Sequence, residues 1–262
     1  MWKYLFLVFI LVGCSNNSVI KTTKQTKQKD EKYLLLKGAN LYSLNKKSEA
    51  LKVYQQVLKL NKQNQIALRE KAIIEAQLGN INQAEKDLEL ALKIDSTDNL
   101  ILKNLAYLNF EKKNYNKSSE YLNRISLDFR NDQDYYILGY IEFINKNYVN
   151  SLKYYEYVNS EEIFNKTLFF ESYLKNLKQL KITSENSYLK LEDKIKYNKK
   201  NTIKLVEYYE TNFINTNFSE RVLKNYLVYN EVDIDIINKL ASIYDKNGNK
   251  ENYKKVLNLI SN

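Results

Sequence analysis

The sequence has no histidine and no proline, and its 262 residues include one cysteine, one methionine, one tryptophan and five glycines. Without histidine the chain lacks the usual general base near neutral pH and the commonest metal ligand. Because Cys14 is the single cysteine, an intramolecular disulfide and a cysteine-based zinc site are both excluded. We therefore expect no enzyme, no cofactor and no bound metal. The absence of proline, the strongest helix breaker, favours a chain built almost entirely of helices.

The residues that are present suffice for a folded core, since 44% of them are hydrophobic. Lysine and arginine number 41 against 31 acidic residues, which gives a formal net charge of +10. Such a balance is compatible with nucleic acid, an anionic membrane or acidic partners. It is also what a sequence crowded with Lys, Asn, Ile and Tyr produces by composition alone.

The first seventeen residues read MWKYLFLVFILVGCSNN. Lys3 is followed by nine apolar residues, Tyr4 to Val12, a run too short to span a bilayer but typical of the core of a signal peptide. The sequence Leu11-Val12-Gly13-Cys14 then resembles the bacterial lipobox. This resemblance implies cleavage between Gly13 and Cys14 and attachment of a diacylglycerol to the Cys14 thiol. The alternative is a short membrane anchor with an incidental cysteine.

A lipidated Cys14 with two or three acyl chains would hold the mature protein on a membrane. Ser15 is not the aspartate that retains lipoproteins at the inner membrane in some bacteria, so the periplasmic leaflet of the outer membrane is favoured. Residues 14–30 are polar, rich in lysine and without periodicity, which predicts a flexible tether. Its lysines are expected to reach anionic headgroups: Lys21, Lys24, Lys27 and Lys29.

From Glu31 onward the sequence repeats itself at a period of 34 residues. Candidate helix N-caps recur at Ser48, Asn82 and Asn116, and small residues follow two positions later at Ala50, Ala84, Ser118 and, after a step of 33, Ser151. A second set of small residues lies about twelve positions earlier, at Gly38, Ala72, Ala106 and Gly139. Small residues that face each other on two helices predict tight antiparallel pairs.

These features resemble the tetratricopeptide repeat, a helix–turn–helix unit of 34 residues. The resemblance implies an all-α fold, a right-handed superhelical solenoid, with Gly38 and Gly139 at helix crossings and Gly79 and Gly248 in turns. The family's usual proline after the second helix is missing, but Asn61, Asn64, Asp95 and Asp98 can end one helix and cap the next. The predicted organisation is a signal peptide (1–13), the lipidated tether (14–30), four repeats (31–158), degenerate helical hairpins (159–232) and a terminal repeat (233–262).

A solenoid of this family exposes a concave groove lined mostly by the first helix of each repeat. Carrying the groove positions over gives five aromatic side chains from the third and fourth repeats, one from the first repeat, and two basic residues: Tyr107, Phe110, Tyr136, Tyr140, Phe143, Tyr42, Arg69 and Lys103. Together they predict an apolar path for an extended peptide or a partner helix. The alternative is that these abundant aromatic rings pack against neighbouring helices.

The sequence therefore predicts a lipid-anchored scaffold of the bacterial cell envelope that binds other envelope proteins or peptides, in outer-membrane or pilus assembly. The assignment to outer-membrane or pilus assembly rests on the resemblance in architecture alone. An alternative function is a surface-exposed lipoprotein that binds host or environmental ligands. We expect no nucleic-acid partner, because an exported protein does not routinely meet one.

Overall fold

The computed structural model describes residues 26–182, 186–213 and 217–259. Within these ranges the regular secondary structure is helical and includes no strand, which confirms the predicted all-α class. The predicted signal peptide, with Gly13 and Cys14, lies outside the described residues. None of the helices in the described ranges is both long and apolar enough to cross a membrane.

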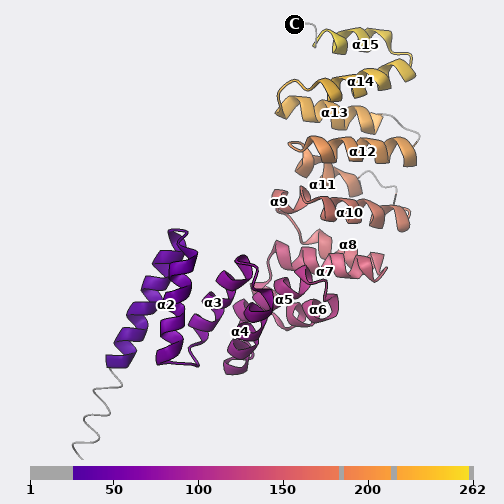
Figure 1. The fold of residues 1–262 in the computed structure, drawn as a ribbon. Helices are drawn as coiled ribbons and strands as arrows, with labels where there is room; N and C mark the ends of the chain where they lie inside the picture. The colour runs from indigo at the N-terminus through magenta and orange to yellow at the C-terminus, as the bar shows by residue number, and fades with distance from the viewer. Residues whose placement is uncertain (1–25, 183–185, 214–216, 260–262) are drawn as a thin grey trace, which may run out of the picture. The chain divides into compact units, whose positions relative to one another are not determined.

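The helices form two compact units, divided in the chain between Phe129 and Arg130 (Figure 1). The first unit contains a helix over residues 26–43, then α2 (Lys47–Leu60), α3 (Gln65–Gln77), α4 (Ile81–Ile94), α5 (Asn99–Glu111), α6 (Tyr115–Arg124) and the 3-10 helix η1 (Leu127–Phe129). The second unit contains α7 (Asp132–Ile144), α8 (Tyr148–Glu156), α9 (Glu161–Phe164), α10 (Thr167–Gln179), α11 (Asn186–Ile195), α12 (Lys199–Asn212), α13 (Asn217–Tyr229), α14 (Ile234–Lys246) and α15 (Lys250–Leu257). The division falls inside the segment expected to carry four successive repeats.

The first helix contains part of the segment predicted to be a flexible tether. Residues 26–30 are already helical, so the predicted boundary at residue 30 was wrong. The segment has no proline or glycine to stop a helix, and its Lys and Gln residues are good helix formers. The apolar side of this helix packs on a core formed with α2 and α3 by Ala50, Tyr54, Val57, Ala67 and Ile74.

The turn inside each of the first four helix pairs has one residue in the left-handed conformation, and these residues follow the predicted period. They are Asn45, Gly79, Lys113 and Lys146, with φ of 59°, 86°, 61° and 63°. The next residue in the chain is the N-cap of the second helix: Lys46, Asn80, Asn114 and Asn147. The N-caps predicted at Ser48, Asn82 and Asn116 were therefore two residues late, because the left-handed residue reverses the chain and the helix starts directly after it.

The connections between pairs confirm the predicted capping residues. Asn61 and Asp95 are the C-caps of α2 and α4. The Asn64 side chain accepts a hydrogen bond from the Ala67 N–H at 2.7 Å, and the Asp98 carboxylate accepts from Leu100 and Ile101. These two side chains thus accept hydrogen bonds from N–H groups of the first helical turn, which have no acceptor within their own helix.

Glycine at the helix crossings is explained by the ring opposite it. A Cβ on Gly38 would lie 2.8 Å from the Tyr54 ring, and one on Gly139 would lie 2.4 Å from the Tyr155 ring. The Ser151 hydroxyl also donates to the Gly139 carbonyl oxygen at 2.7 Å, so the two small residues do face each other. The middle repeats combine alanine with leucine at the same places, as in Ala72 and Leu88, which share one buried cluster. Glycine with tyrosine and alanine with leucine are thus two ways to fill one crossing.

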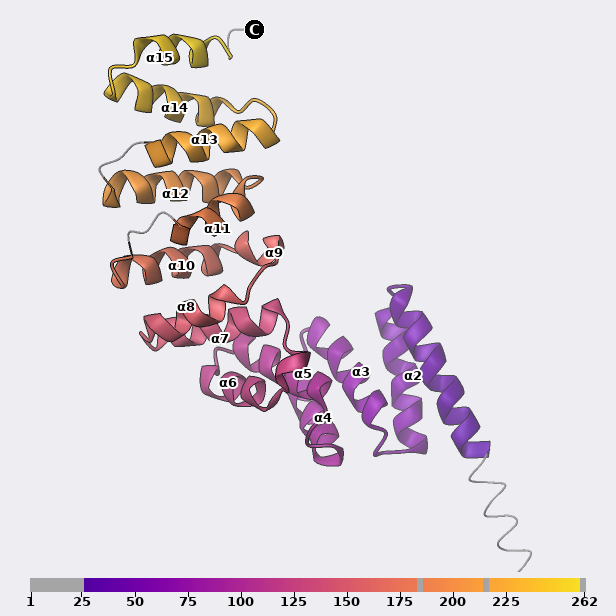
Figure 2. The ribbon, with the colours of Figure 1, turned by 180° about the vertical axis from the view of Figure 1, so that it is seen from behind.

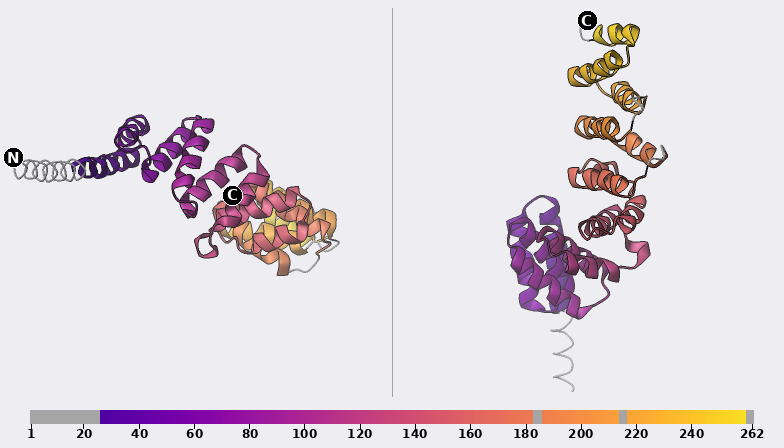
Figure 3. Two further views of the ribbon diagram at one scale, coloured as in Figure 1. Left: turned by 90° about the horizontal axis from the view of Figure 1, so that it is seen from below. Right: turned by 90° about the vertical axis from the view of Figure 1, so that its right-hand side faces the viewer.

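The described residues of the segment 159–232 form the helices α9 to α13, so the helical character predicted for them is confirmed. In the second unit consecutive helices from α10 onward lie side by side in chain order in opposite views (Figures 1 and 2), and the right panel of Figure 3 shows them in two staggered layers. The core between α8 and α10 is aromatic: Tyr155 on α8 contacts Phe169 and Tyr173 on α10 at ring-centroid distances of 4.6 and 5.7 Å.

Candidate functional site

An apolar hollow of about 320 Å³ lies in the first unit between α3 and α5, with side chains of α4 at its base. Its walls are mostly apolar, with two amides, one phenol and one carboxylate at the edge: Ala72, Ile73, Ala76, Gln77, Ile81, Leu88, Asn104, Tyr107, Leu108 and Glu111. The volume is at the lower end of the range for ligand pockets. The hollow therefore accepts an apolar side chain better than a whole metabolite.

The repeat period produces this hollow. Ile73 on α3 and Tyr107 on α5 are 34 residues apart, so two consecutive first helices present equivalent positions to the same space. Hydrogen bonds at both ends of α3 fix its position: Gln65 donates to the Asp98 carboxylate at the N-cap of α5 at 3.2 Å, and Gln77 donates to the hydroxyl of Tyr42, on the helix over residues 26–43, at 2.7 Å. The lining is thus positioned by side chains that lie beside it, and a partner would meet a preformed surface.

Of the groove residues predicted in the first unit, Tyr107 lines the hollow and Tyr42 is joined to its rim through Gln77. Arg69 and Lys103 are half-buried, and the Arg69 guanidinium forms an ion pair with Glu70 at 2.7 Å. Phe110 contacts the Tyr115 ring at 5.7 Å and so covers the turn between α5 and α6.

The predicted groove residues of the second unit pack more strongly against their own helices. Tyr136 is 4% exposed and contacts the Phe169 ring of α10 at 5.8 Å, so its assignment to an open groove was wrong. Tyr140 and Phe143 are half-buried, and Phe143 contacts Tyr148 at 6.2 Å. The five aromatic residues expected to form one path are divided between the two units.

A buried ionic cluster joins α3 to α4 in the first unit. The Lys71 ammonium pairs with Glu75 at 2.8 Å and with Asp87, and Gln83 donates to the same aspartate at 3.1 Å. Burial raises the pKa of the Glu75 carboxyl, and the neighbouring Lys71 opposes that rise only in part. The cluster fixes the two helices that form one wall and the base of the hollow.

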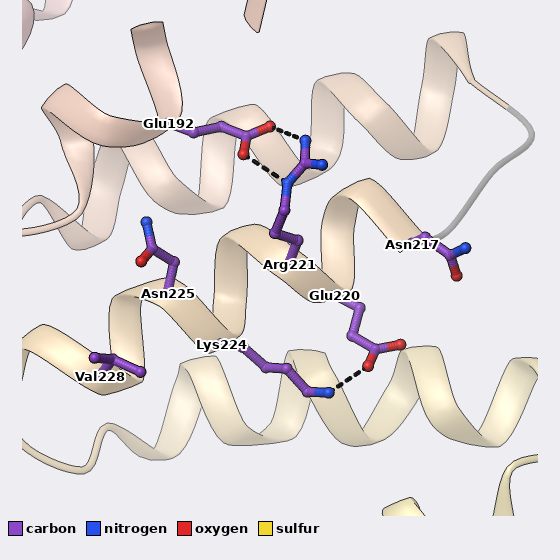
Figure 4. A pocket seen from close by; sticks show the side chains of 7 residues that line it. All are labelled: Glu192, Asn217, Glu220, Arg221, Lys224, Asn225 and Val228. Atoms are coloured by element: carbon purple, nitrogen blue, oxygen red, sulfur yellow. Dashed lines mark hydrogen bonds and ion pairs between the residues drawn. The ribbon is translucent and has the colours of Figure 1, made fainter. Parts of the chain in front are cut away.

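A second pocket, of about 560 Å³, lies in the second unit, and most of the residues that line it are charged or carry an amide (Figure 4). Arg221 on α13 donates to both carboxylate oxygens of Glu192 on α11, at 2.8 and 2.7 Å, and Glu192 also accepts from the Tyr209 hydroxyl at 2.6 Å. Lys224 pairs with Glu220 at 2.5 Å, and that bond raises the pKa of the lysine. The charges are thus paired within the protein: the Glu192–Arg221 ion pair joins α11 to α13, and the Lys224–Glu220 pair lies within α13.

This network was not predicted from the sequence, because Glu192 and Arg221 are 29 residues apart and fit no repeat position. The one feature of the sequence that could have drawn attention to Arg221 is the scarcity of arginine, which occurs four times in the chain. No group of three or more potential metal-ligating side chains occurs in the part of the chain that the structure describes.

Comparison with known proteins identifies the repeats. Residues 31–64 and 70–98 match the family model of the tetratricopeptide repeat. No curated protein matches the sequence. The crystal structure of YrrB, a TPR protein with an unusual peptide-binding site, is similar with a TM-score of 0.53 and 15% identity over 66% of this chain and 90% of that chain.

Two further solved structures are similar at lower scores. PilF of Pseudomonas aeruginosa has a TM-score of 0.46 and 14% identity over 87% of this chain and 97% of its own. A tetratricopeptide repeat protein from Parabacteroides merdae has a TM-score of 0.47 and 15% identity over 89% and 100%. At these identities the likeness to YrrB establishes the fold alone. The chain thus contains tetratricopeptide repeats within an all-helical architecture that resembles solenoids of this family, and such a fold suggests protein–protein interaction or peptide binding.

Proposed function

We propose that this chain is a lipid-anchored interaction scaffold of the bacterial cell envelope, which binds a partner peptide or protein segment through the hollow between α3 and α5. The observation that carries the proposal is the preformed apolar hollow with Tyr107 in its wall. Tetratricopeptide matches at residues 31–64 and 70–98, which include α2, most of α3 and all of α4, support it.

The chemistry of the hollow defines what it binds. Ile73, Ala76 and Leu108 offer an apolar surface whose burial stabilises a complex by about 25 cal/mol per Å². Tyr107 adds a ring that can both pack and form a hydrogen bond. A partner with one large apolar side chain on an extended or helical segment fits this arrangement, and the polar groups at the edge orient its backbone.

The anchor is proposed from Cys14, which follows an apolar run and a small residue. Acyl chains on this thiol would keep the scaffold at a membrane without any membrane-crossing helix. The proposed location is the periplasmic leaflet of the outer membrane, and the proposed role is assembly of an outer-membrane or pilus component. Cys14→Ser should leave an unprocessed, unacylated protein, as mass spectrometry would show. Protease treatment of intact cells would degrade a protein displayed on the cell surface and leave a periplasmic one intact.

Binding in the hollow is tested by a photo-crosslinking amino acid at Ile73 in intact cells, with identification of the crosslinked partner. We expect Tyr107→Ala, introduced with the crosslinker, to weaken recovery of that partner by about tenfold, in line with the cost of removing an aromatic contact residue at an interface. Tyr157→Ala is the matched control, because Tyr157 is a tyrosine that is 60% exposed in the second unit. Undiminished recovery with Tyr107→Ala, at unchanged helicity, would exclude the hollow as the binding site.

A further inference from the structure

The outer side of the first helix combines exposed apolar side chains with lysines. Tyr33 and Leu36 are both 65% exposed, and Leu44, directly after the helix, is 59% exposed. Lys29 and Lys37 follow the same spacing of three and four residues and lie on the same side. We call Lys29, Tyr33, Leu36, Lys37 and Leu44 the outer stripe.

The position of this helix makes the outer stripe unusual. Its opposite side packs through Leu34, Leu41 and Tyr42 on the core of the first unit. The first or last repeat of a solenoid needs a polar outer face to remain soluble. Here three large apolar side chains occupy that face instead, which indicates that something covers them.

The charge of the helix favours an anionic partner. Residues 26–43 contain four lysines and two acidic residues. Of the acidic residues, Glu31 accepts a hydrogen bond from Asn61 at 3.0 Å and one from Asn64, so it points toward α2 and α3. Lys29, Lys32 and Lys37 are exposed and form no ion pair with another described residue. Apolar side chains flanked by lysines are the pattern of helices that lie on anionic bilayers.

We propose that the outer stripe docks on an anionic membrane surface, with Tyr33 and Leu36 inserted between headgroups and Lys29 and Lys37 against phosphates. This inference rests on the proposed lipid anchor. Thr26 follows Cys14 by twelve residues, which at full extension span about 40 Å, so an acylated Cys14 keeps the helix close to the bilayer. Docking would fix the orientation of the first unit on the membrane, which an anchor alone does not do.

The single cysteine provides the test. If Cys14 is acylated, a cysteine placed at Leu36 is the one reactive thiol. Leu36→Cys carries a fluorescent dye on the purified lipidated protein, in vesicles of phosphatidylglycerol and phosphatidylcholine in equal parts with nitroxide-labelled lipid. Leu90→Cys is the matched control, since Leu90 is an exposed leucine of the same unit, at 48%. We expect the nitroxide to remove most of the fluorescence at position 36 and little at position 90.

Charge reversal distinguishes docking of the outer stripe on the bilayer from mere nearness to it through the lipid anchor. Lys29→Glu with Lys37→Glu should abolish the quenching at position 36, because each lysine near an anionic surface contributes roughly fivefold to binding. Equal quenching at positions 36 and 90, or quenching that survives charge reversal, would overturn the proposal. A fluorescence change at position 36 that increases with the protein-to-lipid ratio and does not depend on the nitroxide would also overturn it. Such a result would mean that a second copy of this chain covers the outer stripe.

Wild-type protein distinguishes the two proposals. Failure of the dye to label it is expected for an acylated Cys14. Labelling would refute the lipid anchor, and quenching of Leu36→Cys in a Cys14→Ser background would then test the outer stripe by itself.

Discussion

The crossing of α7 and α8 allows a quantitative test of how glycine and tyrosine share one site. A Cβ added in Gly139→Ala would lie 2.4 Å from two atoms of the Tyr155 ring, which is fully buried. The ring cannot move away easily, because its hydroxyl is within 2.6 Å of the Ser172 hydroxyl and its face is stacked on Tyr173.

The expected magnitudes follow from these contacts. Overpacking a buried site costs about 1–3 kcal/mol, and an overlap at 2.4 Å with a ring that cannot shift easily corresponds to the upper part of that range, about 2–3 kcal/mol. The better helix propensity of alanine returns about 1 kcal/mol, so Gly139→Ala should destabilise by roughly 1–2 kcal/mol. Tyr155→Leu should cost about 2–4 kcal/mol through lost ring contacts and a residual cavity. The double variant recreates the combination found at Ala72 and Leu88. It should therefore be more stable than the sum of the single changes predicts, by about 1–2 kcal/mol.

Urea denaturation followed by far-UV circular dichroism measures all four proteins of this cycle. Ala106→Gly with Leu122→Tyr gives the reciprocal test, since both residues are fully buried at the equivalent crossing. Additive single and double changes would refute the idea that ring size and glycine compensate each other. So would Gly139→Ala that is as stable as the wild type.

Two further changes test local features of the first unit. Lys113→Gly should stabilise by about 0.5–1 kcal/mol in thermal or urea denaturation, since Lys113 has φ of 61° where the preceding repeat has Gly79; a loss of stability would contradict that reading of the turn. The raised pKa of Glu75 means that the folded state binds its proton more tightly than the unfolded state, so this group makes stability fall as pH rises from the ordinary glutamate value through the folded pKa. Glu75→Gln should flatten that fall in denaturation curves measured across the acidic range, and an unchanged pH dependence would assign it to other groups.

The sequence alone determined the features that depend on neighbouring residues. The 34-residue period, the caps at Asn64 and Asp98 and the glycine at the tightest crossing are local, because each is decided within one helix pair or one connection. The error of two residues at the second-helix starts has the same origin. Several polar residues there can cap a helix, and only the backbone shows which one follows the left-handed residue.

The tertiary structure decided which of the side chains at equivalent repeat positions remain accessible to a partner. Tyr136 and Lys103 were predicted by the same rule on equivalent helices, yet Tyr136 is buried because Phe169 of α10 packs against it. The contact between Glu192 and Arg221, and the open outer side of Tyr33 and Leu36, also depend on which helices lie beside them. A repeat pattern specifies the face on which a side chain lies, and exposure of that face is fixed by neighbours that are distant in sequence.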